Sequence, residues 1–221
     1  MSLAAPPERP ARLRAGGALA LLGILGVATA LRFTALDWGL RHPVHLDERV
    51  YVENVVRMLE AGDLDHRFYT YPGLFYYLLA PFVALLGAPR WLTGDAYLVA
   101  RGLVATAGVL DVLLAFWVGR RLLGTAAGLT AALLLAVSPL DVRTAHQVRP
   151  DVLLLGFGFV ALWLFRGLGT LRGDLRAGLL VGLATAVKFT GLLLVPFYLA
   201  ARLLAPGPRL KGLVAAGLVT S

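Results

Sequence analysis

The sequence predicts an all-α protein, a bundle of helices that crosses a lipid membrane several times. Two observations predict this class. The 221 residues are 58% hydrophobic and only 15% charged, whereas a soluble domain carries about 25% charged residues. Several apolar runs also approach the roughly 20 residues that a helix needs to cross the hydrocarbon core. The high hydrophobicity excludes disorder, and the lack of cysteine excludes disulfides and thiolate metal sites.

The apolar runs define the expected membrane helices in order. The first, residues 17–36, is interrupted only by Arg32, and because many runs follow it we interpret it as a membrane helix rather than a signal peptide. The later candidates are residues 72–88, 97–118, 126–140, 152–165, 176–190, 190–204 and 211–221. The last run is long enough for only about half a bilayer, so we expect a fragment of a longer protein.

The basic residues predict the orientation of the chain. The positive-inside rule places the arginines of a tail over residues 1–16 in the cytoplasm. The membrane module, residues 17–221, then carries an outer loop over residues 37–70, which holds seven acidic residues. The later basic clusters all belong inside by the same rule. The net charge of +8 is therefore a topology signal, and nucleic acid is not an expected partner.

The number of membrane crossings leaves two topologies open. An outer loop at 37–70 and an inner Arg120–Arg121 require an odd number of spans between them, and two candidates are present. Segment 72–88 is the shorter and contains Pro81, so we predict that it is re-entrant or lies on the outer surface. The alternative is that it spans and that Arg120–Arg121 lies outside.

A surface helix is expected within the outer loop. Over residues 47–60, apolar side chains recur at helical spacing, at Val52, Val55, Val56 and Leu59. Such a helix is expected to lie along the membrane surface with its apolar stripe toward the bilayer.

This topology brings polar residues that are distant in sequence to the outer face. They are His45, Asp47, Glu48, Arg101, His146, Arg149, Asp151 and Lys188. Carboxylates beside several cations suggest chemistry on a phosphate-bearing substrate, since arginine suits phosphate oxygens and a carboxylate can act as a general base. Asp111 remains within the membrane, where we expect it to pair with a neighbouring helix.

Simpler roles remain open for each of these residues. Arg101 and Lys188 lie near helix ends and could extend to the interface. The acids at 47–48 and 151 could stabilise helix N-termini, and the histidines could be structural hydrogen-bonding groups. A metal site of His45, Asp47 and Glu48 is conceivable, but the spacing is not specific. The sequence therefore predicts no definite metal or cofactor, although a divalent metal is possible.

The order of motifs resembles a known family. An Asp-Glu pair follows the first membrane helix, in His45-Leu-Asp-Glu-Arg-Val-Tyr51, and an aromatic stretch begins at Tyr71-Pro-Gly. Arg101 opens a long helix that ends in Gly119-Arg-Arg-Leu-Leu-Gly124. Ser138-Pro139 precedes Arg149-Pro-Asp151, and Lys188 follows in Ala186-Val-Lys-Phe-Thr-Gly191. This order resembles the membrane glycosyltransferases of the C fold class that use lipid-phosphate sugars, above all the protein O-mannosyltransferases and aminoarabinose transferases.

The resemblance implies a donor, a reaction and a site. The donor would be a sugar on a polyprenyl phosphate, bound at the outer face of the plasma (inner) membrane. Asp47 would deprotonate an acceptor hydroxyl for an inverting displacement, and Glu48 would orient Asp47 or contact the acceptor. Phosphate binding would fall to Arg101, Arg149 and Lys188, and contacts with sugar or acceptor to Asp151, His66, Tyr69 and Tyr71. The acceptor would be a protein, a lipid or a glycan. The open alternatives are a transporter of an anionic substrate and a non-catalytic membrane protein.

Overall fold

A computed structural model describes residues 13–40, 46–86 and 94–205 of the chain, and every regular element in these ranges is helical. The α-helices are α1 (Ala15–Phe33), α2 (Leu46–Ala61), α3 (Leu74–Leu86), α4 (Asp95–Leu123), α5 (Thr125–Ala136), α6 (Pro139–Ala145), α7 (Asp151–Leu164), α8 (Leu171–Val187) and α9 (Leu194–Leu204). Two short 3₁₀ turns, Phe165–Gly167 and Phe189–Leu193, connect α7 to α8 and α8 to α9. The expected all-α class is confirmed.

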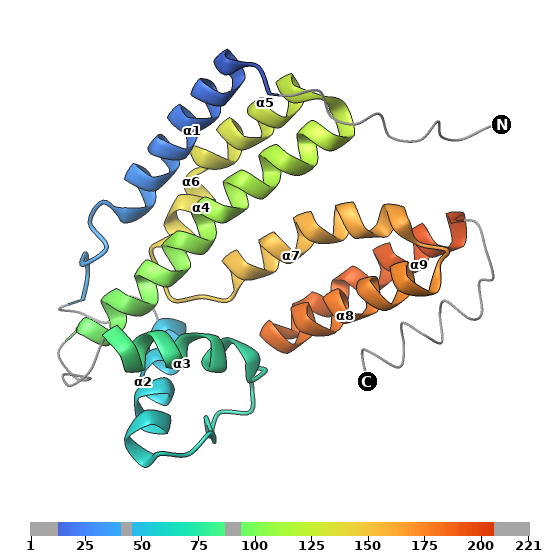
Figure 1. The fold of residues 1–221 in the computed structure, drawn as a ribbon. Helices are drawn as coiled ribbons and strands as arrows, with labels where there is room; N and C mark the ends of the chain where they lie inside the picture. The colour runs from blue at the N-terminus through green and yellow to red at the C-terminus, as the bar shows by residue number, and fades with distance from the viewer. Residues whose placement is uncertain (1–12, 41–45, 87–93, 206–221) are drawn as a thin grey trace.

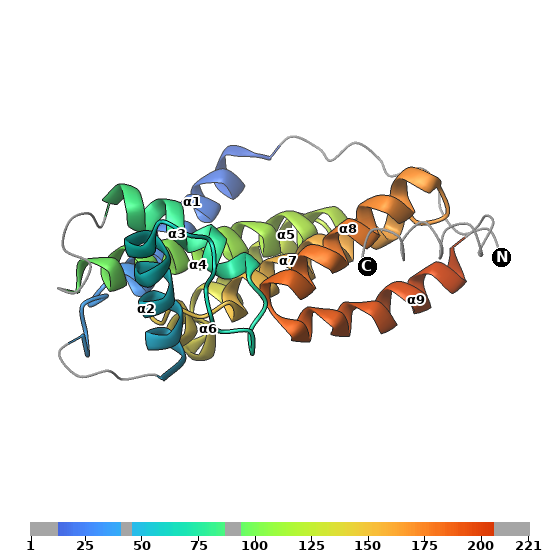
Figure 2. The same ribbon diagram turned by 90° about the horizontal axis from the view of Figure 1, so that it is seen from below.

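The long helix α4 organises the arrangement (Figure 1). Helices α1 and α5 lie along one side of it, α7 packs beside it, and α8 and α9 continue on from α7. Helices α2 and α3 lie together against the N-terminal part of α4, as Figure 2 also shows. Its 29 residues give α4 a length of about 43 Å, which exceeds the roughly 30 Å of a hydrocarbon core.

Two of the described helices, α1 and α4, are long and apolar enough to cross a membrane. Helices α5 and α6 could form a third span together, although they meet at an angle of 60°. Helix α3 has 13 residues with Pro81 inside it and is about 20 Å long, shorter than the hydrocarbon core. The prediction that segment 72–88 does not span agrees with this length. Residues 211–221 lie outside the described ranges.

Small residues allow α4 and α5 to approach closely. A Cβ added to Gly128 of α5 would lie 2.6 Å from the backbone oxygen of Phe116 on α4, and one added to Gly119 would lie 3.0 Å from the Cα of Gly128. Only glycine fits this crossing, which is the packing that small residues provide in membrane helices.

The break between α5 and α6 explains the role of Arg32. Ser138 caps α6 by accepting a hydrogen bond from the backbone N–H of Asp141, and Pro139 suits the first helical position. The break frees carbonyl groups at the end of α5, and Arg32 of α1 donates to two of them, those of Leu135 and Ala136. Arg32 also pairs with Asp141. This fully buried arginine therefore joins α1 to both halves of the broken helix.

The surface helix expected in the outer loop exists as α2, but its apolar stripe does not face a bilayer. Val52 and Val55 are fully buried in a core that they share with Phe75 and Leu79 of α3 and Val104 of α4. Burial against protein replaces the expected burial in lipid because α3 folds back over α2. This packing fixes the N-terminus of α2, which carries Asp47 and Glu48.

The end of α4, which carries a basic cluster, lies at the same end of the bundle as the start of α1. Helix α5 begins beside the start of α1, since a Cβ added to Gly17 would contact the side chain of Thr125. Arg120 and Arg121, at the end of α4, therefore lie at the same end of the bundle as the start of α1. The assignment of this end to the cytoplasm, and the division into a tail and a membrane module, stay predictions.

Candidate active site

Asp47 and Glu48 occupy the first turn of α2, and their side chains diverge because consecutive helical residues are turned by about 100°. The carboxylate of Asp47 accepts a hydrogen bond of 3.2 Å from the hydroxyl of Tyr71. Glu48 points to Arg101 of α4. The two acids of the motif thus have different surroundings, although they are adjacent in sequence.

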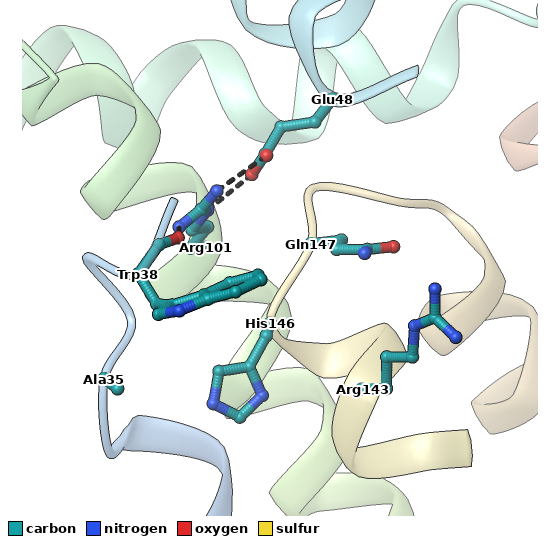
Figure 3. Close-up of a pocket in the computed structure, with 7 residues that line it drawn as sticks. All are labelled: Ala35, Trp38, Glu48, Arg101, Arg143, His146 and Gln147. Atoms are coloured by element: carbon teal, nitrogen blue, oxygen red, sulfur yellow. Dashed lines mark hydrogen bonds and ion pairs between the residues drawn. The ribbon is translucent and has the colours of Figure 1, made fainter. Parts of the chain in front are cut away.

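Glu48 and Arg101 form a buried, bidentate ion pair (Figure 3). Arg101 Nε lies 2.6 Å from Glu48 Oε1 and Nη2 lies 2.8 Å from Oε2, and each side chain is only 4% exposed. Arg101 Nη1 donates to the carbonyl oxygens of Leu36 and Trp38, and the backbone N–H of Val148 donates to Glu48 Oε1. The pair joins four segments of the chain.

These contacts differ from the role that the resemblance implied for Arg101. Four hydrogen bonds, two to a carboxylate and two to carbonyl groups, use most of the five N–H groups that a guanidinium offers. A phosphate would have to displace protein contacts to reach this arginine.

Arg149, Asp151 and Lys188 form a second ionic group beside the first. Asp151 opens α7 and Lys188 follows the last residue of α8, and the antiparallel course of the two helices brings these ends together. Lys188 Nζ lies 2.5 Å from Asp151 Oδ1, and Arg149 Nε lies 3.4 Å from Asp151 Oδ2. The three side chains are between 23% and 34% exposed.

This second group is incompletely hydrogen-bonded. Within the described residues, Arg149 Nε and Asp151 Oδ2 are buried atoms without a hydrogen bond, because the geometry of their contact does not allow one. A buried polar atom without a partner costs free energy, so these two atoms have hydrogen-bonding capacity left for a ligand or for water.

Tyr71 connects Asp47 to this group. Burial raises the pKa of Tyr71, and the carboxylate of Asp47 raises it further; Arg149 lowers it and Asp151 raises it. Tyr71 therefore lies within electrostatic reach of all three charged residues. Asp47, Arg149 and Asp151, predicted from the sequence to share one face, therefore lie near this tyrosine, and Lys188 is joined to them through Asp151.

The two other aromatic candidates lie in different surroundings. His66 is buried and stacks on Tyr76 of α3 at 4.6 Å. Tyr69 is exposed, and its hydroxyl donates to Asp65. Their ring centroids are 5.2 Å apart. The assignment of His66 and Tyr69 to a sugar pocket stays a prediction.

The remaining polar candidates have structural surroundings or lie elsewhere. The ring nitrogens of His146 lie 2.8 and 2.9 Å from the carbonyl oxygens of Val142 and Thr34. Asp111 is buried against Gly156 of α7, and its Oδ2 has no hydrogen bond among the described residues, so the expected pairing across helices is not formed there. His45 lies outside the described residues, which contain no cluster of three or more His, Asp or Glu side chains suited to a metal ion.

Two buried ion pairs were not predicted. Arg32 pairs with Asp141, and Arg202 of α9 pairs with Asp174 of α8 at 3.1 Å. Each arginine stands among apolar residues in the sequence, and a charge at such a position indicates a buried partner as readily as an interfacial position. The sequence offers no signal that identifies the partner.

A solved structure has a fold similar to that of this chain. The solved structure of ArnT from Cupriavidus metallidurans bound to undecaprenyl phosphate is similar, with a TM-score of 0.68 and 22% sequence identity over 94% of this chain. The chain spans 40% of the length of that protein. No curated protein matches the chain significantly in sequence.

A family comparison covers most of the membrane module. The sequence model described as dolichyl-phosphate-mannose-protein mannosyltransferase matches residues 71–220, which include Tyr71, Arg101, Arg149, Asp151 and Lys188. Asp47 and Glu48 precede the matched region. Because the match covers more than half of the sequence, the chain belongs to the dolichyl-phosphate-mannose-protein mannosyltransferase family.

Proposed function

We propose that the chain forms the active-site end of an integral-membrane glycosyltransferase that moves a sugar from a polyprenyl-phosphate donor to an acceptor hydroxyl. The observation that carries the proposal is that Tyr71, which donates a hydrogen bond to Asp47, lies close enough to Arg149 and Asp151 for their charges to act on its pKa. Arg149, Asp151 and Lys188 form an incompletely bonded ionic group. Membership of the family supports the reaction class. The bound lipid of the ArnT structure supports the type of donor.

In the proposed reaction Asp47 is the general base. Its carboxylate takes the proton of the acceptor hydroxyl while the hydroxyl oxygen attacks the anomeric carbon of the sugar. The bond between that carbon and the phosphate oxygen breaks, and polyprenyl phosphate leaves with the electron pair. One displacement inverts the anomeric configuration. Base assistance of this kind contributes about 10²–10⁴-fold to a rate.

The leaving phosphate is the proposed ligand of Arg149 and Lys188. The two cations offset the negative charge that develops on the leaving oxygen, which is an electrostatic contribution to the transition state. Asp151 holds Lys188 at 2.5 Å and thereby orients it. Its Oδ2, which has no hydrogen bond among the described residues, is available to accept one from a sugar hydroxyl, and we assign sugar contacts to Tyr69, Tyr71 and His66 as well.

The buried Glu48–Arg101 pair has a different proposed role, which is to position the base. Glu48 and Arg101 hold the first turn of α2 against α4 and the segment that includes Val148. Because Asp47 precedes Glu48, this contact sets the position of the base. Arg101 therefore acts on the reaction by positioning, and the donor phosphate is left to the more exposed cations.

The location follows from the same proposal. The site would lie on the extracytoplasmic face of the plasma (inner) membrane, with the N-terminus in the cytoplasm, and the acceptor would be a protein, a lipid or a glycan. The apolar helices and the family support the membrane location.

The stereochemistry of transfer tests the proposal. The protein is expressed from its whole gene, including any residues that follow Ser221, and is supplied with polyprenyl-phosphate mannose or polyprenyl-phosphate aminoarabinose. The expected result is a product whose anomeric configuration, read by NMR, is opposite to that of the donor. Retention of configuration, or absence of transfer from every polyprenyl-phosphate sugar while nucleotide sugars are used, would refute it.

The transporter hypothesis has less support. A transporter with inverted repeats is expected to contain broken helices in corresponding positions of two halves. Within residues 13–40, 46–86 and 94–205, α5 with α6 is the one bent pair that together meets the length and hydropathy needed for a span. Its carbonyl groups are used by Arg32 rather than facing a path for a substrate.

A further inference from the structure

A pocket of about 490 Å³ is lined in part by Glu48 and Arg101. Its lining is drawn in Figure 3: Ala35, Trp38, Glu48, Arg101, Arg143, His146 and Gln147. These residues come from the segment after α1, the start of α2, the start of α4, and α6 with the loop that follows it. Arg149 and Lys188, the two cations proposed to bind the donor phosphate, are not among the residues that line this pocket.

The wall formed by residues 34–38 is held in one conformation. His146 contacts the carbonyl oxygen of Thr34, and Arg101 donates to those of Leu36 and Trp38. Ala35, between these contacts, has a φ of 57°, a left-handed conformation that costs a non-glycine residue free energy. Strain of this kind persists only where surrounding contacts maintain it, and it occurs often at ligand sites.

The charges of the pocket favour an anion. Glu48 and Arg101 neutralise each other at one side. At the opposite side Figure 3 shows the guanidinium of Arg143, which forms no hydrogen bond or ion pair with another described residue and is exposed. The pocket therefore presents one cation whose charge no carboxylate among the described residues offsets by contact, and guanidinium binds phosphate through paired hydrogen bonds.

The other walls suit the group that carries the anion. The indole of Trp38 is 70% exposed, and an exposed aromatic face can pack on the apolar face of a ring or chain. The amide of Gln147 adds both a donor and an acceptor for hydroxyl groups. A pocket with one cation, one aromatic face and one amide fits a phosphate attached to a sugar or to a lipid glycerol.

We propose that this pocket is a second ligand site of the protein, which binds the phosphate of a phosphorylated sugar or of a lipid headgroup through Arg143, with Trp38 and Gln147 contacting the attached group. The binding of phosphate in this pocket does not depend on the proposed function.

Trp38 provides a direct probe of binding. The whole protein in phosphatidylcholine nanodiscs is titrated with glucose 1-phosphate and, separately, with glucose, while tryptophan fluorescence is recorded. We expect a saturable change with the phosphate and a much weaker response to glucose. The variant Trp38→Phe should lose the signal, which assigns it to this pocket rather than to Trp91, Trp117 or Trp163.

Substitution of Arg143 tests the assignment of the cation. Arg143→Ala should weaken binding of glucose 1-phosphate by about tenfold or more, since a hydrogen bond to a charged group is lost. The exposed Arg57→Ala, on α2, is the matched control for the loss of one arginine and should bind as the parent does. Lys188→Ala should also bind as the parent does, because its site is separate.

The responses of Arg143→Ala and Lys188→Ala distinguish binding in this pocket from binding at the proposed donor site. A fluorescence change that persists in Arg143→Ala but disappears in Lys188→Ala would place the phosphate in the other site and overturn the proposal, as would no saturable change in the parent. A second titration in nanodiscs that contain phosphatidic acid identifies the source: a headgroup ligand weakens the binding of glucose 1-phosphate by competition, whereas a soluble ligand leaves it unchanged. Loss of sugar transfer without loss of this binding would refute the proposed function alone.

Discussion

Two ionic groups lie next to each other at one end of the helical bundle, and they differ in burial and in hydrogen bonding. In the Glu48–Arg101 pair each side chain is 4% exposed and the guanidinium makes four hydrogen bonds to protein. In the group of Arg149, Asp151 and Lys188 the side chains are about a quarter to a third exposed, and two buried atoms have no hydrogen bond in the described part of the chain.

The difference supports the proposed division between a pair that positions α2 and a group that binds a ligand. A buried pair with complete hydrogen bonding is costly to break because removal of one partner leaves a desolvated charge. A partly exposed ionic group with incomplete hydrogen bonding contributes little to stability and can exchange its contacts for contacts with a ligand. The family resemblance implied phosphate binding for both Arg101 and Lys188, whereas their different surroundings support different proposed roles.

The largest expected effect is on stability, at the buried pair. Glu48→Ala leaves Arg101 buried without its carboxylate, and we expect a loss of about 3–5 kcal/mol in the free energy of unfolding. The measurement is unfolding of the purified protein in detergent. The double variant Glu48→Met with Arg101→Met removes both charges and should recover much of this loss. A single variant as stable as the parent would show that the pair does not hold α2.

The next largest effect is on donor binding, at the partly exposed group of Arg149, Asp151 and Lys188. Lys188→Ala removes a contact with the leaving phosphate, and we expect the KM for the polyprenyl-phosphate sugar to rise about tenfold. Stability should change by less than about 1 kcal/mol, because the ion pair with Asp151 is partly solvated. Lys188→Arg keeps the charge and serves as the control. An unchanged KM together with a large loss of stability would assign Lys188 to the structural class.

A smaller effect is expected at Tyr71, which lies between Asp47 and the partly exposed group of Arg149, Asp151 and Lys188. Tyr71→Phe removes one hydrogen bond to Asp47, and a loss of about 1 kcal/mol corresponds to a kcat lowered about fivefold. Steady-state kinetics measures it. A decrease as large as that caused by removing the carboxylate itself would show that the phenol takes part directly in the chemistry.

The same tyrosine predicts a dependence of stability on pH. Burial and the charge of Asp47 raise the pKa of Tyr71 above its ordinary value, which is about 10. The folded protein thus favours the protonated phenol. This stabilisation is complete below the ordinary pKa and is lost as the pH rises through the raised pKa of the folded state. Melting of the parent and of Tyr71→Phe should therefore differ by a constant amount near neutrality, and the difference should decrease at alkaline pH.

Much of the architecture was predictable because membrane helices leave strong signals. Apolar length predicted α1 and α4, and the alternation of basic clusters predicted that Lys188 and Asp151 share one face. The break between α5 and α6, inside the apolar run of residues 126–140, was not predicted. Contacts between elements were not predictable. Arg32 and Asp141 are 109 residues apart, and the pattern of an isolated arginine near a helix end does not identify its partner.

The surroundings of the site residues were not predictable for the same reason. A helical repeat in α2 indicates an apolar stripe but not whether protein or lipid covers it, and α3 covers it here. Arg101 and Lys188 both stand near helix ends in the sequence. Only the docking of α2 onto α4 gives Arg101 a buried carboxylate and leaves Lys188 beside a partly exposed one.

The division of tasks between Asp47 and Glu48 is the central claim, and Asp47→Asn tests it most directly. Transfer from a polyprenyl-phosphate sugar and thermal unfolding are measured for this variant and the parent, with the protein expressed from its whole gene. We predict that the rate of transfer falls by about 10²–10⁴-fold while the unfolding temperature is unchanged, because Asp47 is not part of the buried pair. Transfer at the rate of the parent would contradict the account.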